Sequence, residues 1–229
     1  MIDMEVTYTF QLEGGHVERF ELRFDPETMD YLGPVPASPP DWAGMEVERC
    51  SHCTIDVDYC PLALRLIKVI ERFHERVSHE KANVVVEMEY RTISADTTVQ
   101  RGLSSMLGLI IPTSGCPHTY WFRPMARFHL PFSGEDETIY RSTSMYMLAQ
   151  YFRQRQGMDF DEDMSGLTRI YRDMEEVNLS LARRLRLASK ADSSVNAVIL
   201  LDFFAKTVPL VIEEKLEEVK GPFARYLKR

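Results

Sequence analysis

The chain has 229 residues, a formal charge of −8 and 45% apolar residues. This length suits one large domain or two small packed ones, and the apolar fraction is sufficient for a core that needs no metal. Because there is no basic surplus to neutralise phosphates, the charge argues against nucleic-acid binding and against an anionic membrane surface. There is no signal-peptide pattern and no apolar run near the roughly 20 residues of a membrane span, so we expect a cytoplasmic protein.

Two N-terminal segments predict a β-hairpin. Residues 5–12 and 16–24 alternate apolar and polar side chains on either side of Gly14-Gly15, and alternation around a Gly-Gly pair is typical of hairpin strands. We expect a further short strand at residues 45–49 and another at residues 82–93, where β-branched side chains alternate.

Helical periodicity governs much of the remaining chain. Pro61 suits the first helical position, which places Cys60 at the N-cap of a helix with an apolar stripe up to Val77. Four later helices are expected at residues 98–112, 135–156, 165–187 and 192–220. Because the last three are long and have short connections, they predict an antiparallel bundle.

The predicted fold class is therefore α+β. A small N-terminal antiparallel sheet carries one packed helix, and a helical part follows that ends in a three-helix antiparallel bundle. We divide the chain into residues 1–95 and 96–229 and expect Cys116 to join the two regions.

The cysteines carry the clearest functional signal. Cys50, Cys53 and Cys60 lie within eleven residues, Cys116 stands alone downstream, and these are all four cysteines of the chain. A C-x2-C pair presents two sulfurs to one point, as in tetrahedral zinc sites. We therefore predict a four-cysteine metal site, with structural zinc favoured.

Two alternatives remain open for these thiols. Cys60 and Cys116 both precede a proline, a pattern that recurs beside iron–sulfur clusters, so a cluster on the same four cysteines is the second interpretation. The third is that they bind no metal, because free cysteines are commonly buried. His52 and His118 lie beside candidate ligands and could replace one or form a second shell.

A dense polar and aromatic segment follows Cys116. Its basic residues predict an anion or substrate pocket, although ordinary ion pairing is the more frequent role of such residues. The candidates for this pocket are Arg101, Arg123, Arg127, His129 and Arg141.

Three segments resemble a bacterial family of uncharacterised proteins. They are Tyr-Cys-Pro-Leu-Ala at 59–63, Thr-Ser-Gly-Cys-Pro-His at 113–118 and Phe-Arg-Pro-Met-Ala-Arg-Phe-His-Leu-Pro-Phe at 122–132. The resemblance runs from about Arg49 to the C-terminus. It implies a bacterial, cytoplasmic protein and assigns no catalytic residue.

Three functions follow as hypotheses. The first is a non-enzymatic module with a structural zinc ion and a surface for a protein partner. The second is an iron–sulfur redox or sensing protein. The third is a metal-dependent enzyme whose open metal position faces residues 120–129.

Overall fold

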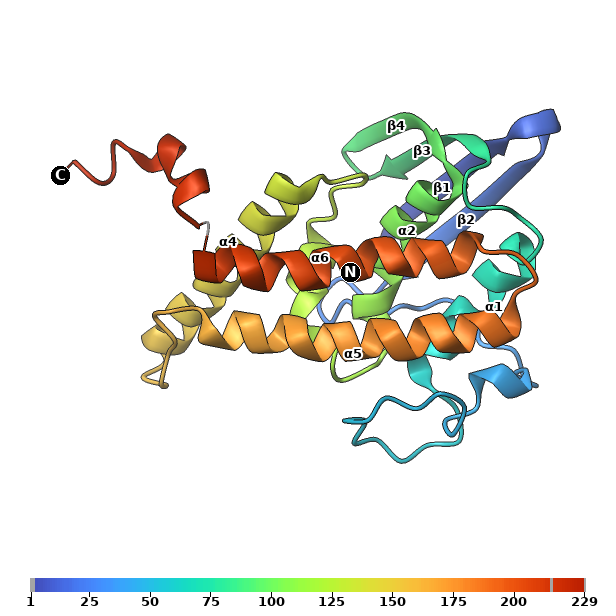
Figure 1. Cartoon of the computed structure of the whole chain (residues 1–229), viewed down its shortest axis with the longest axis horizontal. Coiled ribbons are helices and arrows are strands. Elements are labelled where there is room, and N and C mark those ends of the chain that lie inside the picture. The colour runs from blue at the N-terminus through green and yellow to red at the C-terminus, as the bar shows by residue number, and fades with distance from the viewer. Residues whose placement is uncertain (1–2, 215, 229) are drawn as a thin grey trace.

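The computed structural model describes residues 3–214 and 216–228, without the side chains of residues 203, 204, 207, 210–214 and 217–219. A four-stranded antiparallel sheet precedes a mainly helical part, which confirms the α+β class. Figure 1 shows the long helices α5 (Ser165–Ala188) and α6 (Ser193–Glu214) side by side, with the sheet toward one end of the pair.

The sheet has the strand order β2-β1-β3-β4. Its strands are β1 (Met4–Leu12), β2 (Val17–Phe24), β3 (Lys81–Met88) and β4 (Arg91–Thr98). The predicted N-terminal hairpin is confirmed, since Tyr8 of β1 pairs with Phe20 of β2 across a 3-10 turn at Glu13–Gly15. Tyr8 also pairs with Val86, so β1 is a central strand.

Two strand predictions were wrong. Residues 82–93 do not form one strand, because the chain turns at residues 89–90 and returns as β4. β4 has no fully buried residue, so its apolar alternation is weak. Residues 45–49 form no strand, because residues 45–48 are turns, with a left-handed backbone at Glu48 (φ 46°).

The helices α5 and α6 form an antiparallel pair, as expected, and α6 also packs along α2. The third helix of this layer is therefore mainly α2, whereas α4 contacts α6 only slightly. The α6 helix stops at Glu214, before the predicted end at residue 220, and a 3-10 segment follows at Leu216–Phe223. The other helices are α1 (Pro61–Phe73), α2 (Val99–Thr113), α3 (Arg123–Arg127) and α4 (Glu135–Arg155).

The main core is one cluster that draws buried side chains from the sheet, α1, α2, α5 and α6. At its centre α2 lies very close to the sheet. A Cβ atom at Gly102 would stand 2.6 Å from the Phe10 ring and 2.9 Å from Val84, so only glycine fits there without displacement. Among the described helices, none has the length and apolar character needed to cross a membrane.

Candidate functional site

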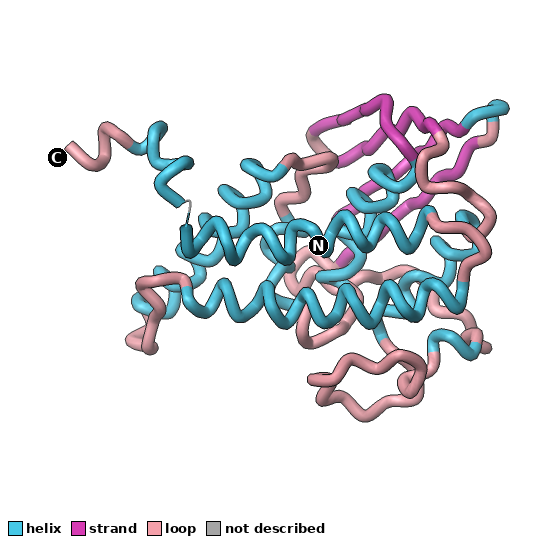
Figure 2. The backbone as a smooth tube through the Cα atoms, in the orientation of Figure 1, coloured by secondary structure: helices cyan, strands magenta, loops and turns pink. Residues whose placement is uncertain are grey.

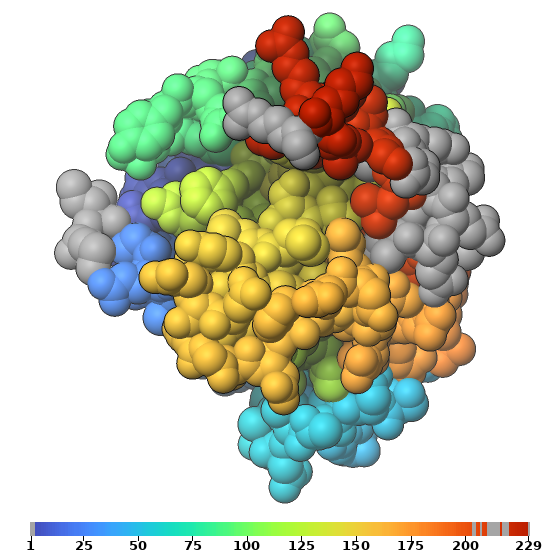
Figure 3. All heavy atoms as spheres, turned by 90° about the vertical axis from the view of Figure 1, so that its left-hand side faces the viewer, coloured from blue at the N-terminus to red at the C-terminus, as the bar shows by residue number. Residues whose placement is uncertain are grey.

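Three of the four cysteines lie on a loop that we call the cysteine loop, residues 44–60. A backbone bridge between Gly44 and Tyr59 closes it, and the Met45 amide donates to the Asp58 carbonyl at 2.9 Å. The loop begins after the 3-10 turn Asp41–Ala43 and ends at Cys60, the N-cap of α1. Figure 2 shows this long irregular segment, and Figure 3 shows it (cyan) protruding beside α5.

One face of α5 holds the cysteine loop in place. The buried guanidinium of Arg184, only 3% exposed, donates to the carbonyl oxygens of Trp42 at 2.7 Å and Gly44 at 2.6 Å. Two turns earlier on the helix, Glu176 Oε1 accepts a hydrogen bond from the Ser51 amide at 3.1 Å. This amide lowers the pKa of Glu176, partly offset by burial, so the carboxylate stays ionised above the C-x2-C turn.

Cys116 interacts electrostatically with two of the loop cysteines. Burial raises the pKa of the Cys116 thiol to about 12, and the nearby Cys60 and Cys50 add to the increase. Hydrogen bonds from the backbone amides of His118 and Thr119 lower the pKa and oppose these effects. The thiols that are 56 and 66 residues away in sequence are therefore close enough to interact electrostatically with Cys116.

Cys50 is the second thiol of this group with a perturbed pKa. Burial raises the pKa of Cys50, a hydrogen bond with the Ser180 hydroxyl lowers it, and neighbouring Cys60 and Cys53 raise it further. Each loop cysteine is thus linked electrostatically to another member of the predicted set. All four cysteines are free thiols.

The two candidate histidines are in contact. The ring centroids of His52 and His118 lie 3.9 Å apart in an edge-on arrangement. The Nε2 atom of each ring is buried and has no hydrogen-bond partner among the described residues. Burial, and then the proximity of His52, lower the pKa of His118, which favours the neutral imidazole. A neutral imidazole is the form that binds a metal.

The predicted donors do not form a coordination shell. Across residues 3–214 and 216–228, no group of three or more His, Cys, Asp or Glu side chains is arranged to hold a metal ion. The donor types nevertheless suit one, since thiols and imidazoles are the usual ligands of zinc and two imidazole nitrogens here have no partner among the described residues.

The predicted basic pocket is divided in the structure. Arg101, His129 and Arg141 line a cavity of about 450 Å³, whereas Arg123 and Arg127 do not. Arg123 forms an ion pair with Asp30, and its guanidinium lies 4.0 Å from the Tyr120 ring centroid. The Arg127 guanidinium lies over the Phe128 ring, 5.9 Å from its centroid.

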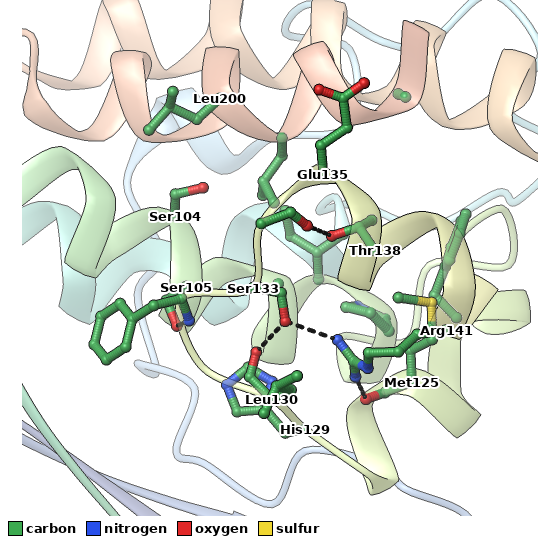
Figure 4. Close-up of a pocket in the computed structure, with 18 of the residues that line it drawn as sticks. Ser104, Ser105, Met125, His129, Leu130, Ser133, Glu135, Thr138, Arg141 and Leu200 are labelled. Atoms are coloured by element: carbon green, nitrogen blue, oxygen red, sulfur yellow. Dashed lines mark hydrogen bonds between the residues drawn. The ribbon is translucent and has the colours of Figure 1, made fainter. Parts of the chain in front are cut away.

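The cavity lies between α2, α4, α5, α6 and the segment before α4. Figure 4 shows Ser104 from α2, Leu200 from α6 and Thr138 from α4 around it. Arg141 donates to the carbonyl oxygens of Met125 at 2.8 Å and Phe128 at 3.0 Å. Because these bonds fix the guanidinium against the backbone, Arg141 organises the segment that precedes α4.

A buried hydrogen-bond chain forms one wall. The Ser105 hydroxyl lies 2.8 Å from the Tyr8 hydroxyl, which lies 2.6 Å from Nε2 of His129. Burial raises the pKa of Tyr8 and lowers that of His129 to about 3, with Arg141 and Arg91 contributing to the second shift. Tyr8 therefore donates to a neutral His129, and Ser105 donates to Tyr8.

Sequence reasoning missed several polar residues at these sites, notably Tyr8, Asn178 and Arg184. Asn178 and Arg184 are buried on α5, where the apolar stripe predicted hydrophobic packing. A polar residue in a predicted apolar stripe was the available signal for Asn178. Tyr8 looked like an ordinary strand residue, because only the tertiary structure brings His129 to it.

None of the four cysteines and neither His52 nor His118 lines the 450 Å³ cavity. The cysteine loop and the cavity are therefore separate features, even though α5 contacts the loop and lines the cavity. Tyr120 and Trp121, which begin the segment predicted to face a metal, are largely exposed.

Comparison with known proteins identifies one family. The model of a domain of unknown function (DUF6901) matches residues 6–224, which extends the resemblance seen in the sequence to the N-terminal hairpin. No curated protein and no solved structure matches the chain.

Proposed function

We propose that this chain, which belongs to the DUF6901 family of domains of unknown function, binds one zinc ion at Cys50, Cys53, Cys60 and Cys116. The observation that carries the proposal is the electrostatic interaction of the Cys116 thiol with Cys60 and Cys50. The buried, unpartnered Nε2 atoms of His52 and His118, on residues close in sequence to Cys53 and Cys116, support it. Buried polar atoms without partners cost about 1–3 kcal/mol each, so they are retained where a ligand satisfies them.

The backbone around Cys116 supports thiolate binding. The backbone amides of His118 and Thr119 lower the pKa of the Cys116 thiol and so oppose the effect of burial, which favours the negative charge that a metal-bound thiolate retains. Closure of the shell requires rearrangement of the side chains of the cysteine loop. The partial exposure of Cys50, Cys53 and Cys60 is compatible with that movement.

The histidine pair favours zinc over an iron–sulfur cluster. Zinc accepts mixed sulfur and imidazole shells, whereas most clusters use four cysteines. His52 and His118 are then either substitute ligands or the outer shell that orients the sulfurs. Removing an outer-shell partner typically weakens metal binding by about 10–100-fold.

The proposed role of the metal is structural. It would link the cysteine loop to the turn after α2, and so restrict a long segment of the unfolded chain. The fixed loop protrudes (Figure 3) and carries exposed Val57 and acidic Asp56 and Asp58. We propose that this surface contacts a protein partner with a basic patch.

Elemental analysis of protein purified anaerobically with reductant tests the proposal. We expect one zinc per chain, and loss of zinc in the Cys60→Ser and Cys116→Ser variants. Ser51→Ala, which keeps every donor in the same loop, is the matched control and should retain zinc. A brown protein with iron and sulfide would select the iron–sulfur alternative, and a protein without metal after zinc addition would refute both.

A further inference from the structure

We propose that the 450 Å³ cavity between α2, α4, α5 and α6 binds a small, mainly apolar molecule that carries a neutral carboxamide or an equivalent donor–acceptor edge. The key residue is Asn178 of α5, which lines the cavity and is 1% exposed. Its Nδ2 and Oδ1 atoms are both buried and have no hydrogen-bond partner in the part of the chain that the structure describes. The inference is independent of the zinc proposal, because no cysteine lines this cavity.

The walls define the apolar body of the ligand. Ile111, Phe122, Met174, Leu200 and Ala205 contribute apolar surface from three helices and from the turn before α3. The volume lies in the range of about 300–1,000 Å³ that is usual for small-molecule sites. Figure 4 shows that side chains from different elements face this space.

Asn178 defines the polar end. A side-chain amide offers a donor and an acceptor side by side, and a second carboxamide, a lactam or a similar edge satisfies both together. An ionised carboxylate offers acceptors only, so it would leave the Asn178 oxygen without a donor. A cavity of this volume has room for water at its polar end, so water is the competing occupant beside Asn178.

The charges around the cavity do not select an anion. Arg141 already donates to Met125, Phe128 and Ser133. The exposed lining residues Arg101 and Glu135 carry opposite charges. Because burial of an uncompensated ionic group is costly, a neutral head group is favoured deep in the cavity.

Three probes that share one alkyl chain test the head-group preference: octanamide, octanoate and octan-1-ol. Titrations at pH 7.5, followed by NMR of ¹⁵N-labelled protein, should show saturable octanamide binding about tenfold or more tighter than octanoate binding. Asn178→Leu should weaken octanamide binding by about tenfold, while Asn83→Leu, an amide on β3 bonded to Asp96, should leave it unchanged.

A measurement on the wild-type chain tests the proposal even if the Asn178→Leu variant does not fold. The side-chain NH₂ signals of Asn178 should shift more with octanamide than with octan-1-ol at equal saturation of the backbone signals, because a single hydroxyl cannot satisfy the amide donor and acceptor side by side. The proposal is overturned if octanoate binds as well as octanamide, if no probe binds up to its solubility limit, or if the Asn178 signals do not respond.

Discussion

Acidification should destabilise this protein through His129, which packs against Tyr8 and is 7% exposed. Its pKa is lowered from 6.5 to about 3, first by burial and then by Arg141 and Arg91. The unfolded chain therefore takes up a proton on this histidine below about pH 6.5, while the folded chain does not until about pH 3. The free energy of unfolding is therefore not reduced by this histidine above about pH 6.5, and it decreases as the pH falls toward 3.

The magnitude follows from one pKa unit being worth about 1.4 kcal/mol. From pH 7.5 to pH 5.0, protonation of this histidine in the unfolded chain lowers the free energy of unfolding by about 2 kcal/mol. The whole pKa difference, from 6.5 to about 3, corresponds to about 5 kcal/mol at low pH. Other groups also titrate in this interval. The contribution of His129 is therefore the difference between wild type and a variant that keeps the hydrogen bond but does not titrate.

The variant is His129→Gln, whose amide can accept the hydrogen bond from Tyr8. Urea unfolding followed by circular dichroism at pH 7.5 and 5.0 should show that wild type loses about 2 kcal/mol more than His129→Gln. The control His16→Gln changes an exposed histidine that contacts Glu18, and this variant should follow the wild type. If wild type and His129→Gln lose equal free energy of unfolding, the histidine is not held neutral in the fold.

Three further predictions concern packing, anchoring and metal chemistry. Gly102→Ala should lower Tm, because overpacking against Phe10 costs about 1–3 kcal/mol. The control Gly108→Ala, whose added Cβ has its nearest contact at 3.9 Å, should raise Tm. Equal Tm shifts in the two variants would contradict the close approach of α2 to the sheet. Arg184→Met should lower the free energy of unfolding in urea by about 2–4 kcal/mol, because two backbone carbonyls lose their donor. The same variant should make the cysteine loop sensitive to protease. The control Arg186→Met, at an exposed position, should have neither effect. Zinc binding at pH 7 should release at least the protons of the Cys50 and Cys116 thiols, whose pKa values are raised, so the zinc affinity should increase with pH. Calorimetry in buffers of different ionisation enthalpy measures this proton release. Binding without proton release would contradict thiolate ligation.

The sequence was informative where local chemistry decides the structure. Alternation around Gly14-Gly15 predicted the first hairpin, and Pro61 predicted the start of α1 with Cys60 at its N-cap. It was not informative for β4, because a half-exposed edge strand has little apolar alternation. The packing of α6 on α2 also escaped prediction, since chain order favours neighbours and tertiary contacts do not have to follow it.

The candidate sites were likewise predictable where a sequence motif marks the residues, and not where only the tertiary structure brings them together. The clustered cysteines and the histidines beside them were visible as motifs, and the structure places His52 against His118. The basic pocket was only partly predictable, because Arg123 turned out to pair with Asp30. The position of Asn178 in an apolar stripe was visible in the sequence, but the cavity that it lines became known only from the structure.

X-ray absorption spectroscopy of the zinc-loaded protein tests the central claim most directly. We predict a shell dominated by sulfur at about 2.3 Å, with any remaining ligand a nitrogen at about 2.0–2.1 Å. A shell of only oxygen and nitrogen, or a protein that takes up no zinc, would contradict it.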